Sequence, residues 1–331
     1  MKLVVITGCL GLIGSHLTRQ CLELGWKVYG IDACTYAANT DLLVEFGYYG
    51  QNFKFIKEDI ADLTYLPDCD YVINVAAESH VGNSIVDSSD FIQSNIVGVK
   101  NLLDLIRNKQ QNVSDRPVLF HFSTDEVYGD ITEGEHIETD ILKPSNPYSA
   151  SKAAADMLIL AWARTYDIKY LILRPTNNYG IGQYPEKLIP VTVKLLMRNK
   201  KIKLHNKGEP IRNWLHSDDT AAAVISIIES GVTNEIYNVA GGFEQKNITT
   251  VKKIVEQYFT IPGKDPAACG SCKKHIEKWE DYLDLSYVRE GQDIRYALND
   301  DKLRALGWEP EKKFDEEIED IVEYYKNNFK W

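Results

Sequence analysis

The sequence contains no long hydrophobic run. Of its 331 residues, 44% are apolar, which is enough for a sizeable core, but no stretch approaches the roughly 20 consecutive apolar residues that a transmembrane helix needs. The first apolar run starts directly after Met1-Lys2, so a secretory signal is not expected either. We therefore expect a cytoplasmic, globular protein that binds no membrane.

Positive charge is also scarce. Lysine and arginine number 37 against 48 aspartates and glutamates, which gives a formal net charge of -11. Sequence-independent nucleic-acid binding needs many basic side chains to neutralise phosphates. We expect no nucleic-acid partner, and any anionic ligand has to be held by a few local groups.

Cysteine is sparse and scattered, with six in the whole chain. This usage fits a reducing compartment better than a disulfide framework. Cys269 and Cys272 form one CxxC motif near His275, which is compatible with half a zinc site or with a redox pair. Because a second CxxC is missing and structural zinc takes four ligands, we interpret the motif as a surface loop and expect no metal.

A strand, a glycine turn and a helix open the chain. The apolar run of residues 3–7 is followed by Gly8, Gly11 and Gly14 and then by a helical pattern. Glycines allow a tight turn in which a pyrophosphate can approach the N–H groups at the helix start. A glycine triplet alone is weak evidence, but a second strand ends in Asp32, where an acid can bind the adenosine ribose. The combination predicts dinucleotide binding and favours NAD over NADP.

The alternation of strands and helices continues. Residues 53–56 lead to Asp59, and residues 71–75 lead to the small pair Ala76-Ala77. Loops after parallel strands line the ligand crevice of an open sheet. A long helical stretch over 91–107 and a second helix that begins beside Tyr148 follow, and we expect the two to pair with their copies in a homodimer. The pattern predicts an α/β fold with a Rossmann-type doubly wound parallel sheet.

The character of the chain changes after the strand at 170–173. Shorter and less regular segments with more loop residues follow, although 217–228 reads as a helix and 235–239 as another sheet strand. We predict that residues 1–176 and about 217–240 form the NAD-binding domain. Residues of about 177–216 and 241–331 then form a smaller, interleaved α+β substrate-binding domain, ending in an amphipathic helix with one apolar side: Phe314, Ile318, Ile321, Val322 and Tyr325.

Tyr148 and Lys152 are spaced one helical turn apart, so their side chains share a face. A nearby ammonium and a positively charged nicotinamide favour the tyrosinate, which can take a proton from a sugar hydroxyl. The YxxxK pattern is common by chance, and it gains weight only because a dinucleotide turn precedes it.

Asp125 and Glu126 are adjacent carboxylates that follow an apolar run. Such a pair can merely cap a turn. In a dry crevice, however, the two repel, so that one stays protonated as an acid while the other acts as a base. An acid beside a base supports the elimination of water.

Motifs along essentially the whole chain resemble those of the nucleotide-sugar 4,6-dehydratases. The resemblance is closest to the dTDP-glucose 4,6-dehydratases of the extended short-chain dehydrogenase/reductase superfamily. The Thr124-Asp125-Glu126 triplet is the specific part, because related epimerases usually carry one Ser or Thr without the acid pair. Besides the glycine turn, the motifs occupy residues 35–39, 76–81, 123–129, 146–152, 174–180, 185–190, 212–215 and 289–296.

The resemblance implies a hydro-lyase of deoxysugar biosynthesis. Tyr148, helped by Lys152 and Thr124, would deprotonate the 4-hydroxyl while a hydride passes from C4 to NAD. Glu126 would remove the C5 proton, and Asp125 would protonate the departing 6-hydroxyl. Return of the hydride to C6 would leave a 4-keto-6-deoxy sugar.

The resemblance also implies the binding residues. Those for the cofactor are Gly8, Gly11, Leu12, Ile13, Gly14, Asp32, Thr35, Asp59, Ile60, Ala76, Ala77, Ser79, Asn95, Tyr148, Lys152 and Asn178. Those for the nucleotide sugar are Ser84, Thr124, Asn177, Glu186, Lys187, Leu188, Arg212, Asn247, Arg289 and Tyr296.

Three departures from the family pattern concern the substrate. Gly82-Asn83 stands where the family commonly has Asp-Arg, Gln292 replaces a His, and His205 replaces a Tyr. The loss of bulk at Gly82-Asn83 makes a larger 2-substituent conceivable, so dTDP-glucose, UDP-glucose and UDP-N-acetylglucosamine all stay open as substrates.

Two other functions remain as alternatives. A 4-epimerase needs Tyr148 and Lys152 but leaves Asp125 and Glu126 without a task. A catalytically silent NAD-binding scaffold leaves the phosphate-binding arginines unexplained.

Overall fold

A computed structural model describes residues 1–109, 116–260, 278–288 and 293–329 of the chain. Within these residues, seven parallel strands form the main sheet in the order β10-β6-β5-β4-β1-β2-β3. Most are short apolar, β-branched runs, as is typical of parallel strands that are covered on both faces. Their bounds are β1 Leu3–Thr7, β2 Lys27–Asp32, β3 Phe53–Lys57, β4 Tyr71–Asn74, β5 Val118–Phe122, β6 Tyr170–Pro175 and β10 Glu235–Val239.

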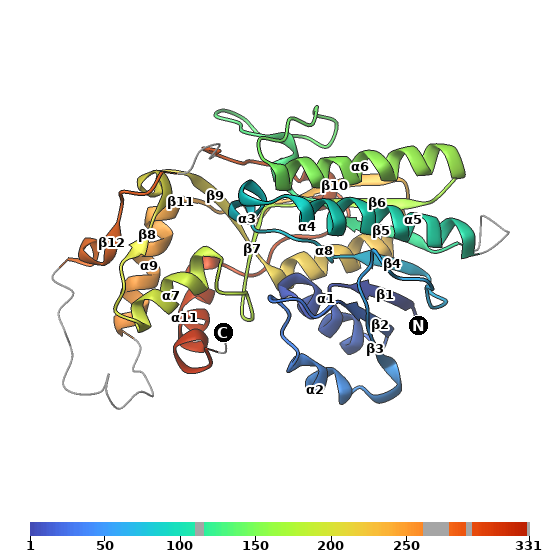
Figure 1. Cartoon of the computed structure of the whole chain (residues 1–331), viewed down its shortest axis with the longest axis horizontal. Coiled ribbons are helices and arrows are strands. Elements are labelled where there is room, and N and C mark those ends of the chain that lie inside the picture. The colour runs from blue at the N-terminus through green and yellow to red at the C-terminus, as the bar shows by residue number, and fades with distance from the viewer. Residues whose placement is uncertain (110–115, 261–277, 289–292, 330–331) are drawn as a thin grey trace.

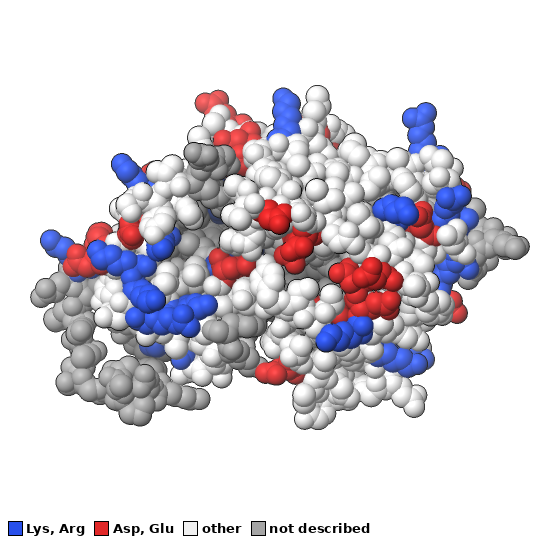
Figure 2. Space-filling view, in the orientation of Figure 1, with Lys and Arg blue, Asp and Glu red and all other residues white. Residues whose placement is uncertain are grey.

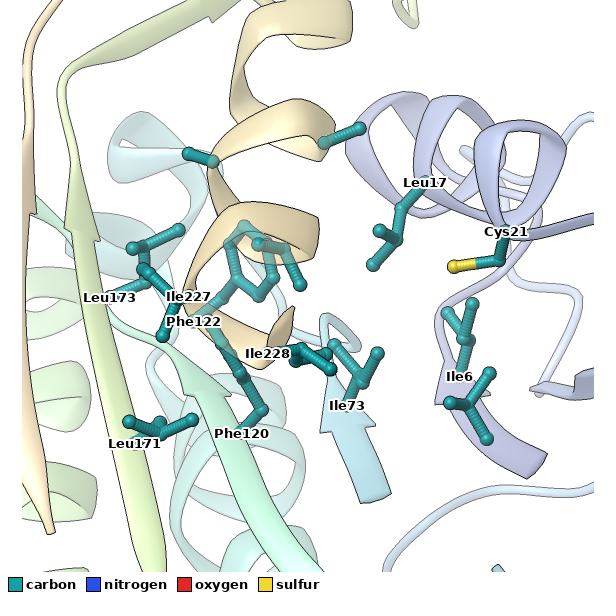
Figure 3. Packing of buried hydrophobic residues seen from close by; sticks show 14 of the residues in the cluster. Ile6, Leu17, Cys21, Ile73, Phe120, Phe122, Leu171, Leu173, Ile227 and Ile228 are labelled. Atoms are coloured by element: carbon teal, nitrogen blue, oxygen red, sulfur yellow. The ribbon is translucent and has the colours of Figure 1, made fainter. Parts of the chain in front are cut away.

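Helices cover both faces of this sheet (Figure 1). On one face lie α1 (Leu12–Glu23), α2 (Leu42–Gly47) and α8 (Ser217–Ser230), and on the other lie α5 (Gly98–Lys109) and α6 (Pro147–Tyr166). Figure 3 shows Leu17 and Cys21 of α1 on the side of Ile6, and Ile227 and Ile228 of α8 near Phe120 and Phe122. This layering confirms the predicted doubly wound α/β fold.

The stretch over 91–107 is helical, as the spacing predicts, but it is not one regular α-helix. It consists of α4 (Ser89–Ile92), a π-helical turn (Gln93–Val97) and α5. Single π-turns widen a helix locally. Here the wide turn carries Asn95, which is fully buried and whose side chain bonds the backbone of Glu78 and the hydroxyl of Ser151.

A smaller part of the molecule lies beyond one end of the main sheet (Figure 1). It contains a sheet in the order β11-β9-β7 and a short parallel pair, β12 with β8. The five predicted apolar positions of the last helix are all buried, and they pack with Tyr179 and Trp214 of the smaller sheet. The elements are β7 Asn177–Tyr179, α7 Leu188–Met197, β8 Ile202–Lys203, β9 Ile211–His216, β11 Glu244–Lys246, α9 Asn247–Thr260, β12 Leu283–Asp284 and α11 Phe314–Asn327.

The remaining elements are short. They are the helices α3 (Val81–Val86) and α10 (Asp301–Arg304) and the 3-10 helices Gly50–Asn52, Asp125–Tyr128, His205–Gly208 and Trp279–Tyr282. In the sequence, α8 and β10 lie between β9 and β11 of the smaller sheet, but they belong to the main part: β10 pairs with β6 and α8 packs on α1.

Cys269, Cys272 and His275 lie outside the described residues. In the part of the chain that is described, no helix combines the length and the apolar character that a bilayer crossing requires.

Candidate active site

A cavity of about 570 Å³ lies at the carboxyl ends of the main-sheet strands. Its wall includes the loops that follow β1, β2, β3, β4, β5 and β6 and the segment before α7. It thus lies in the crevice where open parallel sheets bind ligands. Figure 2 shows acidic side chains around the hollow in the centre of the visible face.

The glycine turn forms one end of the cavity. Gly8 has φ +67°, and a Cβ there would lie 2.7 Å from the backbone nitrogen of Ala76; a Cβ on Gly14 would lie 2.0 Å from the Gly8 oxygen. Helix α1 begins at Leu12 without a side-chain cap from any residue described. The N–H groups of its first turn have no acceptor within the helix, so the turn has the donors that a pyrophosphate needs.

Asp32 closes this end of the cavity. Its carboxylate accepts hydrogen bonds from the backbone nitrogens of Leu10 (3.0 Å) and Cys34 (2.8 Å). Burial raises the pKa of Asp32, while the two backbone bonds lower it. Asp32 therefore also stabilises the loop that carries the glycines, a role that its position in the sequence does not reveal.

Most residues predicted to hold the cofactor lie on the cavity wall. Asn95 is the exception among them: it is buried behind the wall and bonds Glu78 and Ser151. The predicted residues on the wall are Gly8, Gly11, Leu12, Ile13, Gly14, Asp32, Thr35, Asp59, Ile60, Ala76, Ala77, Ser79, Tyr148, Lys152 and Asn178.

The five predicted catalytic residues meet at one place on this wall. Thr124, Asp125 and Glu126 follow β5, and Asp125 opens a 3-10 helix. Tyr148 and Lys152 belong to the first turns of α6. All five line the cavity.

The start of α6 is held firmly. Asn146 caps it in a reciprocal capping box with Ser149, and Pro147 occupies the first helical position. The backbone nitrogen of Tyr148 donates to Ser84 Oγ at 3.2 Å. Lys152 Nζ donates to the carbonyl oxygen of Phe122. The Tyr-Lys pair is therefore tied to α3 and to the end of β5.

Burial dominates the electrostatics of the Tyr-Lys pair. It raises the pKa of Tyr148, and the charges of Glu126 and Asp125 raise it further. Burial lowers the pKa of Lys152 to about 8, against the opposite effect of Asp156. The protein groups around the phenol therefore favour its protonated form, and additional positive charge in the cavity is required to favour the tyrosinate.

Asp125 has the environment of an acid. It is 3% exposed, its Oδ1 accepts a bond from Thr124 Oγ1 at 3.0 Å, and its buried Oδ2 has no hydrogen-bond partner among the described residues. Burial, followed by the charge of Glu126, raises the pKa of Asp125 to about 7. A carboxyl group with this pKa still carries its proton in part of the molecules at neutral pH.

Glu126 has more polar partners than Asp125. Its Oε2 accepts bonds from Asn146 Nδ2 (3.2 Å) and from the hydroxyl of Tyr296 (3.4 Å). Burial raises its pKa, while the charge of Arg212 and the bond from Asn146 lower it. The two neighbouring carboxyl groups thus lie in different surroundings, which suits one to hold a proton and the other to take one.

The residues predicted to hold the nucleotide sugar divide into two groups. Thr124, Asn177, Glu186 and Lys187 line the cavity. Lys187 Nζ bonds the carbonyl and the hydroxyl oxygens of Ser79 at 2.8 and 3.2 Å.

The second group is not among the described residues that line the cavity. Arg212 stacks on the ring of Tyr296, 4.7 Å from its centroid, and Tyr296 in turn reaches Glu126. Asn247 Oδ1, at the start of α9, is buried without a partner among the described residues. The Leu188 side chain packs in the apolar core of the smaller part, and Ser84 supports Tyr148. Arg289 lies outside the described residues.

Two site residues had not been assigned from the sequence. Asn146 bonds Glu126, and its signal was present, because Asn before Pro marks a helix start. Asp293 accepts bonds from Tyr296 and Ser145, and its backbone oxygen accepts one from Arg212. Asp293 lies in the 289–296 motif three residues before Tyr296, but its contacts with Ser145 and Arg212 join segments that are distant in the chain.

Comparisons with known proteins agree with this architecture. The chain is 37% identical to the dTDP-glucose 4,6-dehydratase of Neisseria meningitidis serogroup B, covering 100% of this chain and 95% of the relative. It is also 37% identical to the low-salt glycan biosynthesis protein Agl12 of Haloferax volcanii, covering 97% and 98%. The crystal structure of DesIV, a dTDP-glucose 4,6-dehydratase from Streptomyces venezuelae with NAD and TYD bound, superposes with a TM-score of 0.87 at 32% identity and covers 98% and 97%.

The chain is therefore an extended short-chain dehydrogenase/reductase. It belongs to the GDP-mannose 4,6-dehydratase family, whose model matches residues 5–321. This confirms the resemblance that the motifs carry. A solved UDP-glucose 4-epimerase of Thermotoga maritima has a TM-score of 0.81 but only 23% identity, and so shows the shared fold alone.

Proposed function

We propose that the protein is an NAD-dependent 4,6-dehydratase that converts a nucleotide-diphosphate hexose into its 4-keto-6-deoxy form. The observation that carries this proposal is the meeting of two catalytic sets on one wall. Tyr148 and Lys152 serve the 4-hydroxyl, and Asp125 and Glu126 lie beside them in the same cavity. An epimerase has no use for the two carboxyl groups.

The glycine turn would hold the pyrophosphate of NAD against the first turn of α1, with Asp32 at the ribose. The tight turn, which Gly8 and Gly14 permit because backbone atoms lie where their Cβ atoms would be, and the uncapped helix start support this placement. NAD, when bound, supplies the hydride acceptor and donor that a net redox-neutral dehydration needs.

Proton transfers fall to three side chains. The tyrosinate of Tyr148, favoured by the ammonium of Lys152 one turn away and by the positive charge of the nicotinamide, would take the proton of the 4-hydroxyl and become a neutral phenol, and Thr124 would orient that hydroxyl. Once C4 is a ketone, the proton on C5 is acidic and Glu126 removes it. Asp125 then protonates the departing 6-hydroxyl, a task that fits its buried, unpaired Oδ2 and its pKa of about 7.

The diphosphate and the nucleotide are held on the side of the smaller part. Lys187 and Arg212 supply positive charge, and the fork of an arginine matches phosphate oxygens. Asn177, Asn247, Tyr296 and Glu186 complete the polar surface, with the backbone at Leu188. The two proposed domains, residues 1–176 with 217–240 and residues 177–216 with 241–331, would thus serve the cofactor and the sugar nucleotide.

The sugar remains open among dTDP-glucose, UDP-glucose and UDP-N-acetylglucosamine. The ring of His80 fills part of the space at Gly82, because a Cβ on Gly82 would lie 2.9 Å from His80 Cε1. Neither residue is among the described residues that line the cavity, so this contact does not choose between the three sugars.

A homodimer is part of the proposal. Ile92, Val97 and Met157, on α4, the π-turn and α6, are 49%, 38% and 49% exposed, an apolar surface suited to a second copy.

One assay tests the function. The purified protein is incubated with each of the three nucleotide sugars in heavy water, and the products are analysed by mass spectrometry and NMR. Loss of water with deuterium at C5 supports the dehydratase. Inversion at C4 without loss of water refutes it.

A further inference from the structure

A buried ion pair lies directly behind the catalytic wall. Asp156 of α6 is 0% exposed and Arg174 of β6 is 2% exposed. Arg174 Nε and Nη2 donate to Asp156 Oδ2 at 3.0 and 2.9 Å. Neither residue is among the cavity-lining residues of the described chain, so neither touches a ligand bound there.

The ion pair holds the residue before the catalytic triplet. Ser123 Oγ donates to Asp156 Oδ2 at 3.1 Å, and Ser123 directly precedes Thr124. One turn earlier on α6, Lys152 bonds the carbonyl of Phe122. Two side chains of α6 thus hydrogen-bond two successive residues at the end of β5.

The same ion pair holds the residue that ends the catalytic 3-10 helix. Arg174 Nη1 donates to the Tyr128 hydroxyl at 2.7 Å, and its guanidinium carbon lies 4.8 Å from the centroid of the Tyr128 ring. Tyr128 is 1% exposed and donates to Asn238 Oδ1 of β10 at 2.8 Å. Asp125 and Glu126 therefore lie on a segment fixed at both ends to one pair of side chains.

Stability alone does not account for this arrangement. A buried ion pair pays a large desolvation penalty, and apolar side chains of similar volume often serve stability as well or better. Hydrogen bonds to charged groups are directional and fix the positions of their partners, whereas apolar packing is not directional. Here the fixed partners, Ser123 and Tyr128, flank the acid and the base.

We propose that the Asp156–Arg174 pair is a positioning device that sets Asp125 and Glu126 relative to Tyr148 on the neighbouring helix. This inference rests on the proposed dehydratase function. Neither Asp156 nor Arg174 exchanges a proton with the substrate in this scheme. They act through their hydrogen bonds with the hydroxyls of Ser123 and Tyr128. These two residues lie before and after the catalytic triplet and so fix its position.

Conservative variants that leave the ion pair intact test the idea. Tyr128→Phe removes the hydroxyl and keeps the ring, and Ser123→Ala removes the other link. The matched controls are Tyr237→Phe, a buried ring on β10, and Ser230→Ala, whose hydroxyl bonds a carbonyl at the end of α8. Each protein is assayed for kcat and KM, for reduced cofactor during a single turnover, and for its thermal unfolding midpoint.

We expect kcat to fall roughly tenfold in each link variant, with KM changed less than about twofold, because small displacements of reacting groups cost rate more than binding. Reduced cofactor should accumulate, since elimination slows more than oxidation at C4. Both controls should turn over like the wild type.

Two results would overturn the proposal. One is wild-type turnover in both link variants. The other is equal slowing of oxidation and elimination together with a lower unfolding midpoint, which indicates a merely structural role. If the wild-type protein itself makes no 4-keto-6-deoxy sugar, the proposed function fails instead, and the two failures are thereby distinguished.

Discussion

The two ends of the cavity are built in different ways. The cofactor end is made largely of backbone: the turn from Gly8 to Gly14 and the start of α1 are contiguous in sequence, and Asp32 follows on the next strand. The catalytic end is made of side chains from distant segments, because Glu126 meets Asn146 and Tyr296, and Arg174 joins Asp156 to Tyr128. The glycine turn can form only where side chains are absent. The catalytic end, in contrast, works only if its side chains hold one another in place.

From this contrast we expect the largest loss of activity when a residue at the catalytic end is changed. Glu126→Gln keeps the shape and removes the base, so elimination should fall roughly a thousandfold or more, while binding and oxidation at C4 are spared. Deuterium at C5 and loss of water measure the effect. A variant that eliminates water at the normal rate would show that another group is the base.

The cofactor end should instead be sensitive to a single added carbon. Gly8→Ala places a Cβ 2.7 Å from the Ala76 nitrogen at φ +67°, so we expect affinity for NAD to fall roughly a hundredfold, since the variant distorts the turn itself. Titration with NAD by calorimetry measures this.

Gly25→Ala is the matched control for Gly8→Ala. Gly25 also has a positive φ, +74°, but a Cβ there would meet no described atom within 4 Å. It should lose a little stability and keep its affinity for NAD. Equal losses of NAD affinity in both variants would refute the role of close approach.

The pH dependence should be set at the catalytic end. Because the pKa of Asp125 is raised from 3.8 to about 7, the folded protein prefers the protonated carboxyl. Asp125 therefore lowers stability progressively as pH rises from about 4 to about 7. Relative to the wild type, Asp125→Asn should become more stable over this interval and level off above it, as measured by denaturant unfolding.

Activity should follow the same group. Above pH 7 the wild-type elimination rate should fall about tenfold per pH unit, since the acid loses its proton. A flat rate between pH 7 and 9 would exclude Asp125 as the acid.

The smallest effect is expected at Arg212, which we propose binds the diphosphate of the nucleotide sugar. Arg212→Lys keeps the charge but loses the planar stack on Tyr296. We expect KM for the nucleotide sugar to rise about threefold to tenfold with little change in kcat. A large loss of kcat with an unchanged KM would place Arg212 with the catalytic groups instead.

The two ends of the cavity differ in how much of them could be predicted from the sequence. The glycine turn, Asp32 and the Tyr-Lys spacing were readable because each depends on neighbours within one or two turns or one strand. The helical stretch predicted over 91–107 is present, but its π-turn and the place of Asn95 behind the wall were not foreseen. Both depend on packing against Glu78 and Ser151, which periodicity does not encode.

What the sequence determined by itself was the alternation of strands and helices, the glycine turn and the types of catalytic side chain, since all of these follow from local spacing. Only the tertiary structure decided how the proposed acid and the proposed base differ: Asp125 is buried and its Oδ2 has no partner among the described residues, while Glu126 accepts hydrogen bonds from Asn146 and Tyr296. It also decided that one ion pair holds both ends of their segment. The physical reason is that desolvation and charge coupling depend on which distant segments are brought together, and those contacts form only when the whole chain folds.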